Sequence, residues 1–268
     1  EACDDDNTTD GDGCSSLCQD EIIPVCEVSV TFPASFDTPL NTFNTKCQKF
    51  TAPEPGVYRI IYDNPDLSDT YGSVAYVAEP ESWRPLFALG AGFYDGGMTF
   101  SSNVTTPQYQ DKVYVNANPE DGAVLWRIQF SGCSVCTGTD TIRIDFIPKR
   151  RLSLEDASYV GTTSHTDPND YETLLTAGTA VVEAGELLFT NIDTCGNGGG
   201  AADVFRDTTA QGFAIASNGW PKFCNSESRF YAREVEPGEF SIRTRMADWD
   251  CCNNTGTRTT SFYVGHLQ

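Results

Sequence analysis

The chain has 268 residues, enough for one large domain or for two modest domains with an additional small module. Its 38 acidic and 17 basic side chains give a formal net charge of -21, which excludes binding to nucleic acid or to an anionic membrane surface by general electrostatic attraction. No apolar run is long enough to predict a transmembrane helix.

The first stretch of interest runs from Cys3 to Cys18, with the sequence CDDDNTTDGDGCSSLC. Its Asp, Asn, Gly and Thr residues favour turns, so we expect a loop stapled by cysteines. Aspartates this close together repel one another unless a cation lies among them, and Ca²⁺ binds carboxylate and amide oxygens in glycine-containing loops. The alternative is a solvated acidic arm. The predicted Ca²⁺ ligands are Asp4, Asp6, Asn7, Asp10 and Asp12.

The same residues carry a resemblance to a known family. EACDDDNTTDGDGCSSLCQDE, residues 1–21, resembles the extracellular cysteine-rich repeat first catalogued in myxobacteria, which reads ECDDGN, a short spacer, GDGC and a final Cys. Asp6 replaces the usual glycine, and the family's opening Cys-Gly-Asp-Gly segment is missing here. The resemblance implies an exported protein in which one cysteine lacks its usual partner.

Eleven cysteines are a high number for this length and indicate disulfides in an oxidising compartment. The pairs Cys133/Cys136 and Cys251/Cys252 have no second pair at zinc-site spacing, and a redox role for Cys133-x-x-Cys136 lacks an adjoining helix. The odd count predicts a free thiol or an intermolecular disulfide. The candidate disulfide residues are Cys3, Cys14, Cys18, Cys26, Cys47, Cys133, Cys136, Cys195, Cys224, Cys251 and Cys252.

Three sequons, at Asn7, Asn103 and Asn253, are candidate glycosylation sites in a source that glycosylates exported proteins. Together with the cysteines they favour an extracellular or cell-surface location. No signal peptide is apparent, so we expect a mature, processed product.

Short alternating segments predict strands along the rest of the chain. In 141–147, Ile142, Ile144 and Phe146 are expected to face inward, with Arg143 and Asp145 facing outward. No helix of three turns is predicted before residue 148. The expected strands lie at 28–32, 56–60, 72–77, from 87, 113–115, 124–130, 141–147, 180–182, 186–189, 203–205, 212–216, 229–232, 240–246 and 261–266.

Between the two sets of strands, Lys149-Arg150-Arg151 is the one basic cluster, and we interpret it as a domain linker. The segment that follows, to about residue 173, is polar and predicted to be rich in turns. The segment 193–200 is predicted to be a cysteine- and glycine-rich loop.

An internal repeat supports two units of similar structure. The segment from Val113, VYVNANPEDGAVLWRIQFSGCSVC, is similar to FYAREVEPGEFSIRTRMADWDCC from Phe230, and at a period of 116 residues Gly122 meets Gly238. We therefore predict an all-β chain with an acidic Cys-rich module at 1–26, one β-sandwich at 27–150 and a second at 151–268.

A second resemblance involves the same turns. FTAPEPGVYRI at 50–60 and YAREVEPGEFSIRT at 231–244 resemble the signature of the bacterial pre-peptidase C-terminal domain, and DVFRDTTAQGFAIASNG from Asp203 resembles its upstream strand. That family is a jelly-roll sandwich appended to secreted proteins. The resemblance implies two tandem jelly-roll-like sandwiches with a non-catalytic surface role.

Motifs of enzymatic chemistry are lacking. His165 and His266 are interpreted as surface residues, and no nucleophile elbow, zinc-protease helix, phosphate loop or dinucleotide fingerprint occurs. We therefore expect no enzyme; a hydrolase using a carboxylate pair is the enzymatic alternative. A sugar-stacking platform is a further alternative, built from Trp83, Trp126, Trp220 and Trp249.

The leading hypothesis is an extracellular structural or adhesive protein, a self-assembling subunit of a surface filament or coat. Its N-terminal module would use Ca²⁺ or a disulfide to join copies of the chain, and such a head-to-tail contact gives open fibres. The alternative is a secreted carbohydrate-binding accessory module with glycans as partners.

Overall fold

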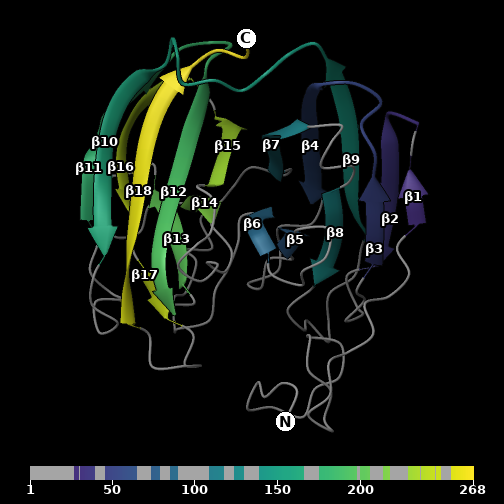
Figure 1. Ribbon diagram of the computed structural model, residues 1–268, viewed down its shortest axis with the longest axis horizontal. Helices are drawn as coiled ribbons and strands as arrows, with labels where there is room; N and C mark the ends of the chain where they lie inside the picture. Colours follow the sequence, from purple (N-terminus) through teal and green to yellow (C-terminus); the bar gives the residue numbers. More distant parts are fainter. Residues whose placement is uncertain are drawn as a thin grey trace, which may run out of the picture.

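A computed structural model provides the structure of the protein (Figure 1). It describes residues 27–29, 31–39, 46–64, 74–78, 85–89, 109–117, 124–129, 139–165, 175–197, 200–205, 214–217, 229–235, 237–244, 246–248 and 255–268. These residues form strands, turns and bends, and the described part contains no helix.

The strands fall into two sets separated by the linker after residue 148. The first set comprises β1 (Glu27–Ser29), β2 (Ala34–Pro39), β3 (Lys46–Phe50), β4 (Gly56–Asn64), β5 (Val74–Ala78), β6 (Pro85–Leu89), β7 (Tyr109–Ala117), β8 (Val124–Gln129) and β9 (Thr139–Pro148). The second set comprises β10 (Ser158–His165), β11 (Leu175–Val182), β12 (Leu187–Asn197), β13 (Gly200–Phe205), β14 (Ala214–Ser217), β15 (Arg229–Glu234), β16 (Gly238–Thr244), β17 (Met246–Asp248) and β18 (Thr255–Gly265).

Each set contributes strands to both of two large sheets. The 8-stranded sheet has the order β10-β18-β12-β15-β7-β4-β9-β2. The 10-stranded sheet has the order β1-β3-β8-β5-β6-β14-β13-β16-β11, and β17 pairs with β13.

The two halves have the same topology. Read outward from the middle, β7-β4-β9-β2 corresponds to β15-β12-β18-β10, and β6-β5-β8-β3 corresponds to β14-β13-β16-β11. Eight strands in two four-stranded sheets make a jelly roll, so the chain holds two jelly rolls. The shared strand order agrees with the internal repeat, which aligns the β7–β8 segment with the β15–β16 segment.

The two rolls join edge to edge in both sheets. Antiparallel β7 and β15 pair Tyr114 with Ala232 and Lys112 with Glu234, while β6 meets β14 at Ala88 and Ser217. One approximate two-fold axis therefore relates the two rolls. Both sheets run without interruption from one roll into the other. The boundary predicted near residue 150 lies between β9 and β10, and the division into separate domains stays a prediction.

A cluster of aromatic side chains lies in the described core of the first roll, beside buried aliphatic residues such as Ile60 and Ile144. The ring of Tyr58 lies 5.5 Å from that of Phe32 and 5.6 Å from that of Phe146, and Phe50 completes the cluster. In the second roll, aliphatic side chains surround Phe262. The buried members there are Ala180, Val182, Leu188, Ile242, Phe262 and Val264.

A third apolar cluster lies under the linker and draws on both rolls. Val57, Tyr114, Leu152, Leu187, Phe189 and Ala232 are its buried members. The side chain of Asn116 holds the linker by accepting a hydrogen bond from the Leu152 N–H at 2.7 Å and donating one to the Leu152 carbonyl at 3.2 Å. The linker also pairs with the C-terminus, because Arg151 and Gln268 exchange backbone hydrogen bonds.

The predicted all-β class and the jelly-roll sandwiches are confirmed, and most predicted strands are present. Ile142 and Ile144 are buried and Arg143 is exposed, as the alternation predicts. Strands β2, β3 and β10 were not predicted, and β1 ends at Ser29 rather than at Phe32. The loop predicted at 193–200 was wrong, because β12 continues to Asn197 in register with β18.

Candidate functional site

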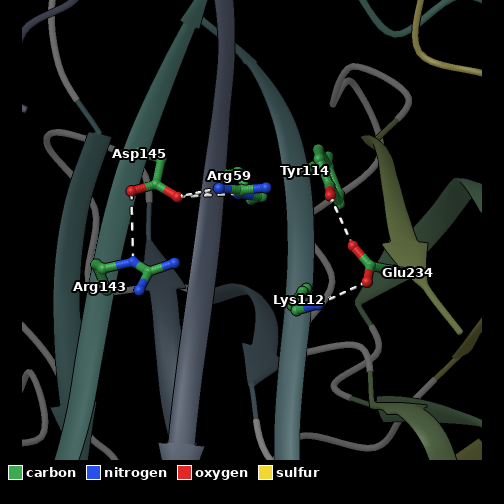
Figure 2. Close-up of polar contacts among 6 residues, drawn as sticks. All are labelled: Arg59, Lys112, Tyr114, Arg143, Asp145 and Glu234. Carbon is green, nitrogen blue, oxygen red and sulfur yellow. Dashed lines mark hydrogen bonds and ion pairs between the residues drawn. The ribbon is translucent and has the colours of Figure 1, made fainter. Parts of the chain in front are cut away.

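A row of charged and polar side chains crosses the seam between the two jelly rolls on the outer face of the 8-stranded sheet (Figure 2). We call it the junction row. It consists of Arg143 and Asp145 from β9, Arg59 from β4, Lys112 and Tyr114 from β7, and Glu234 from β15.

Strand register explains why these residues meet. Arg59 lies opposite Asp145 on one side and opposite Tyr114 on the other. Across the seam, Lys112 lies opposite Glu234. Residues directly opposite one another in antiparallel strands share a face and approach closely, so the register alone places the row on one face.

The first part of the row lies within the first roll. Arg59 donates a hydrogen bond from Nε to Asp145 Oδ2 at 2.9 Å, and its Nη2 forms an ion pair with the same oxygen. Arg143 approaches Asp145 Oδ1 at 3.4 Å. Asp145 therefore lies between two guanidinium groups, as Figure 2 shows.

The second part joins the two rolls. Glu234 accepts a hydrogen bond from Lys112 Nζ at 2.5 Å and another from the Tyr114 hydroxyl at 2.9 Å. Both donors come from the first roll and the acceptor from the second. These contacts clamp the rolls together at the edge where the sheets meet.

The surroundings shift the pKa values of the clamp. Burial raises the pKa of Tyr114 to about 12, and the hydrogen bond to Glu234 acts in the same direction. Partial burial raises the pKa of Glu234, but the hydrogen bonds from Lys112 and Tyr114 outweigh it, so its pKa lies below the ordinary value. At neutral pH the clamp thus joins a carboxylate to an ammonium group and a neutral phenol.

Every charged group of the row has an ionic partner within the row. Beneath it, on the inner face, Arg233 is buried and lies over the Tyr231 ring at 6.0 Å from the centroid. β15 therefore places a charged side chain on each face of the 8-stranded sheet at the seam: Glu234 on the outer face and Arg233 on the inner face.

This row was not predicted as a site from the sequence. The only expectation was that Arg143 and Asp145 face outward; Arg143 is exposed, and Asp145 on the same face has a side chain that is 18% exposed. Alternation in VYRII could also have placed Arg59 outward. The pairing of β7 with β15 links positions far apart in the sequence, and no local pattern announces it.

The sites predicted from the sequence fall largely beyond the described residues. The predicted Ca²⁺ ligands Asp4, Asp6, Asn7, Asp10 and Asp12 and the sequons at Asn103 and Asn253 all lie there. Of the eleven cysteines, only Cys47 in β3 and Cys195 in β12 lie in described strands. Among the described side chains, no group of three or more His, Cys, Asp or Glu could hold a metal ion.

The histidines are placed in part. His165 ends β10 instead of lying in a turn-rich linker. His266 is exposed as predicted, with Nδ1 3.2 Å from the Gly185 carbonyl oxygen and Nε2 3.8 Å from Glu186. Of the four tryptophans, Trp126 lies in β8 and the others lie beyond the described ranges. In those ranges no helix could span a membrane.

Comparison with known proteins gives no family. No protein-family model matches the chain, and no curated protein matches it. Solved structures with a similar course of the chain include the PBSX exported protein XepA, at 8% identity and a TM-score of 0.26 over 87% of this chain and 86% of that one. The ANXUR2 extracellular domain from Arabidopsis thaliana matches at 8% identity and a TM-score of 0.29. That match covers 89% of this chain and 90% of that one.

The major capsid protein P2 from bacteriophage PM2 matches at 9% identity and a TM-score of 0.22, over 88% of this chain and 98% of that one. Similarities at these values carry no functional assignment, so any function has to be argued from the chain's own residues.

Proposed function

We propose that the chain is a non-catalytic structural subunit of an extracellular filament or coat. The observation that carries this proposal is the seam: two jelly rolls share both sheets and a buried cluster, and Glu234 is clamped to Lys112 and Tyr114 across it. A unit joined through both layers resists bending between its halves, which is what a load-bearing subunit requires.

The paired charges, the cysteine content and the hydrogen-bonded hydroxyl groups support the same role. Charged groups in the junction row are paired with one another, whereas a catalytic site keeps at least one group poised for a substrate. The eleven cysteines favour an exported protein, and the surface hydroxyls of β10 and β18 are hydrogen-bonded to each other.

The N-terminal module is proposed as the joint between copies. Its clustered aspartates would bind Ca²⁺ and dock on the next copy, and the odd cysteine would strengthen the contact by an intermolecular disulfide. A contact between two different surfaces is heterologous, so repetition gives an open fibre.

The experiment measures particle mass by light scattering, with Ca²⁺ and with EGTA, together with non-reducing gel electrophoresis. The test variant is Asp4→Asn/Asp6→Asn/Asp10→Asn/Asp12→Asn, and the control is Glu239→Gln, an exposed acid on β16. We expect large assemblies in Ca²⁺ for the parent chain and the control, and their loss in EGTA and in the test variant. Assemblies of equal size for all three proteins, in Ca²⁺ and in EGTA, would show that the N-terminal module does not join the copies.

A further inference from the structure

The two edge strands at the outer end of the second roll, β10 and β11, contain no Lys, Arg, Asp or Glu. Their sequences are SYVGTTSH and LTAGTAVV, in a chain of which 21% of residues are charged. β10 ends the 8-stranded sheet and β11 ends the 10-stranded sheet, so both sheets finish on uncharged strands at this end (Figure 1).

Exposed edges usually carry charges, especially lysine, or proline, because a bare row of backbone donors and acceptors invites another strand. The opposite end of the molecule follows that rule. There β2 contains Asp37 and Pro39, and β1 contains Glu27. The end formed by β10 and β11 has neither charged residues nor proline, and each of its two strands carries one irregularity in register, before Gly161 and before Gly178.

The same two strands carry the large exposed hydrophobic residues found among the described side chains. Tyr159 on β10 is 61% exposed, and Val181 on β11 is 63% exposed. Tyr159 also packs edge-on against Tyr263 of β18 at 5.4 Å between ring centroids. Apolar side chains at an uncharged edge favour burial against a partner.

Two glycines bring the edges together into one end surface. A Cβ at Gly161 would lie 1.9 Å from the Ala177 carbonyl oxygen, and one at Gly178 would lie 2.7 Å from the Val160 carbonyl oxygen. β10 and β11 therefore approach each other backbone to backbone across the sandwich. A partner that meets one strand also meets the other.

The chain itself shows how such an end can be extended. At the seam, β7 pairs with β15 in one sheet and β6 with β14 in the other, and one approximate two-fold operation relates both pairs. A second copy placed by a similar operation at the far end would pair β10 with its own equivalent and β11 with its own equivalent.

We propose that β10 and β11 form an isologous interface with a second copy of this chain, which continues both sheets across a two-fold axis. The partner is a second copy because the chain already joins equivalent edges of its two rolls in this way at the seam, in both sheets. This inference deepens the proposed assembly function and rests on it, but the contact needs neither Ca²⁺ nor the N-terminal module.

The test is the mass of the chain in EGTA, measured by light scattering over a dilution series, with non-reducing gels to exclude disulfide-linked species. We expect a dimer of about twice the 29.3 kDa chain mass. Thr162→Lys/Val181→Lys places like charges at the interface from two exposed positions, and we expect self-association at least about tenfold weaker.

Two further variants make the result specific. Thr162→Glu/Val181→Glu is also expected to be monomeric, and mixing it with the lysine variant should restore the dimer through opposite charges. Ser35→Lys places the same charge on exposed Ser35 of β2, at the opposite edge, and should leave the dimer intact. Circular dichroism checks that each variant keeps the β-sheet spectrum.

Several outcomes would overturn the proposal. A parent chain that stays monomeric in EGTA at every concentration would do so, as would a Ser35→Lys variant that loses the dimer, since that result indicates a head-to-tail contact of β2 with β10. A chain that is monomeric and binds oligosaccharides through Tyr159 would show instead that this end of the molecule binds glycans. Failure of the Ca²⁺ joint would leave the dimer result unchanged, so the two proposals fail separately.

Discussion

Two buried tyrosines of the first roll have opposite hydrogen-bonding situations. Burial raises the pKa of both Tyr58 and Tyr114 to about 12, so both stay neutral at physiological pH. The Tyr114 hydroxyl donates to Glu234, whereas the buried Tyr58 hydroxyl has no hydrogen-bond partner in the described part of the chain. A buried polar group without a partner lowers stability.

We therefore predict opposite signs for the two phenylalanine substitutions. Tyr58→Phe should raise the free energy of unfolding by about 1 kcal/mol, and Tyr114→Phe should lower it by about 1 kcal/mol. Urea unfolding of the three proteins measures both changes. A loss of stability in Tyr58→Phe equal to that in Tyr114→Phe would show that the Tyr58 hydroxyl has a partner.

The seam clamp predicts a pH dependence. The pKa of Glu234 is lowered in the folded chain, so its contribution is present above the ordinary carboxyl pKa of 4.5 and is lost as pH falls through the folded value. Glu234→Gln should lower the free energy of unfolding by less than about 1 kcal/mol at neutral pH, because Glu234 is partly exposed.

In acid, below the folded pKa of Glu234, the parent chain and Glu234→Gln should be equally stable. The check is the difference in unfolding free energy between the two proteins at neutral pH and in acid, with Glu239→Gln as a control on β16. A difference that grows as the pH falls would contradict the assignment of Glu234 as an ionised acceptor.

At the scale of the elements, β10 and β11 depend on glycine at two contact points. Gly161→Ala would drive a methyl group into the Ala177 backbone, which cannot move without shifting β11. We predict a loss of about 2–3 kcal/mol, as expected for overpacking against a rigid neighbour. Thermal unfolding followed by circular dichroism measures it.

Gly185 supplies the contrasting case. It lies in the turn between β11 and β12 with φ at +87°, and no heavy atom lies within 4 Å of the position that an alanine methyl group would take there. Gly185→Ala should therefore cost only about 1 kcal/mol, from backbone conformation alone. Equal losses in the Gly161 and Gly185 variants would contradict the close approach of β10 and β11.

Sequence alone predicted the strands that alternate cleanly. In β9, Ile142 and Ile144 are buried and Arg143 is exposed, because a strand with one face on the core has to alternate. β10 was missed because its bulge between Tyr159 and Gly161 breaks the alternation, and because its side chains are mostly hydroxyls.

The candidate site was harder to predict than the strands. Arg59 and Asp145 are 86 residues apart, and Tyr114 and Glu234 are 120 apart, so only the tertiary register brings each pair together. The repeat indicated that two similar units exist. It held no information on which edge of one unit meets which edge of the other.

At the scale of the whole molecule, the two rolls should unfold together. They share two continuous sheets, and the cluster that contains Leu152 takes buried residues from β4 and β7 of one roll and from β12 and β15 of the other. Scanning calorimetry should show one transition with equal calorimetric and van't Hoff enthalpies. Two resolved transitions would mean that the seam contributes little.

The hydrogen bonds between Asn116 and Leu152 also involve both rolls, because they hold the linker over the apolar cluster that the two rolls share. Asn116→Asp keeps the size of the side chain but replaces the amide donor with an acceptor facing the Leu152 carbonyl. We expect a loss of about 1–3 kcal/mol in calorimetry and still a single transition. Asn116→Asp with unchanged stability would contradict the role of this pair in holding the linker.

Electron microscopy of the purified protein in Ca²⁺ shows directly whether this chain assembles as a structural subunit. We predict extended filaments or sheets in Ca²⁺ that shorten to small particles after EGTA is added. Uniform single particles with the mass of one chain, before and after EGTA, would contradict it.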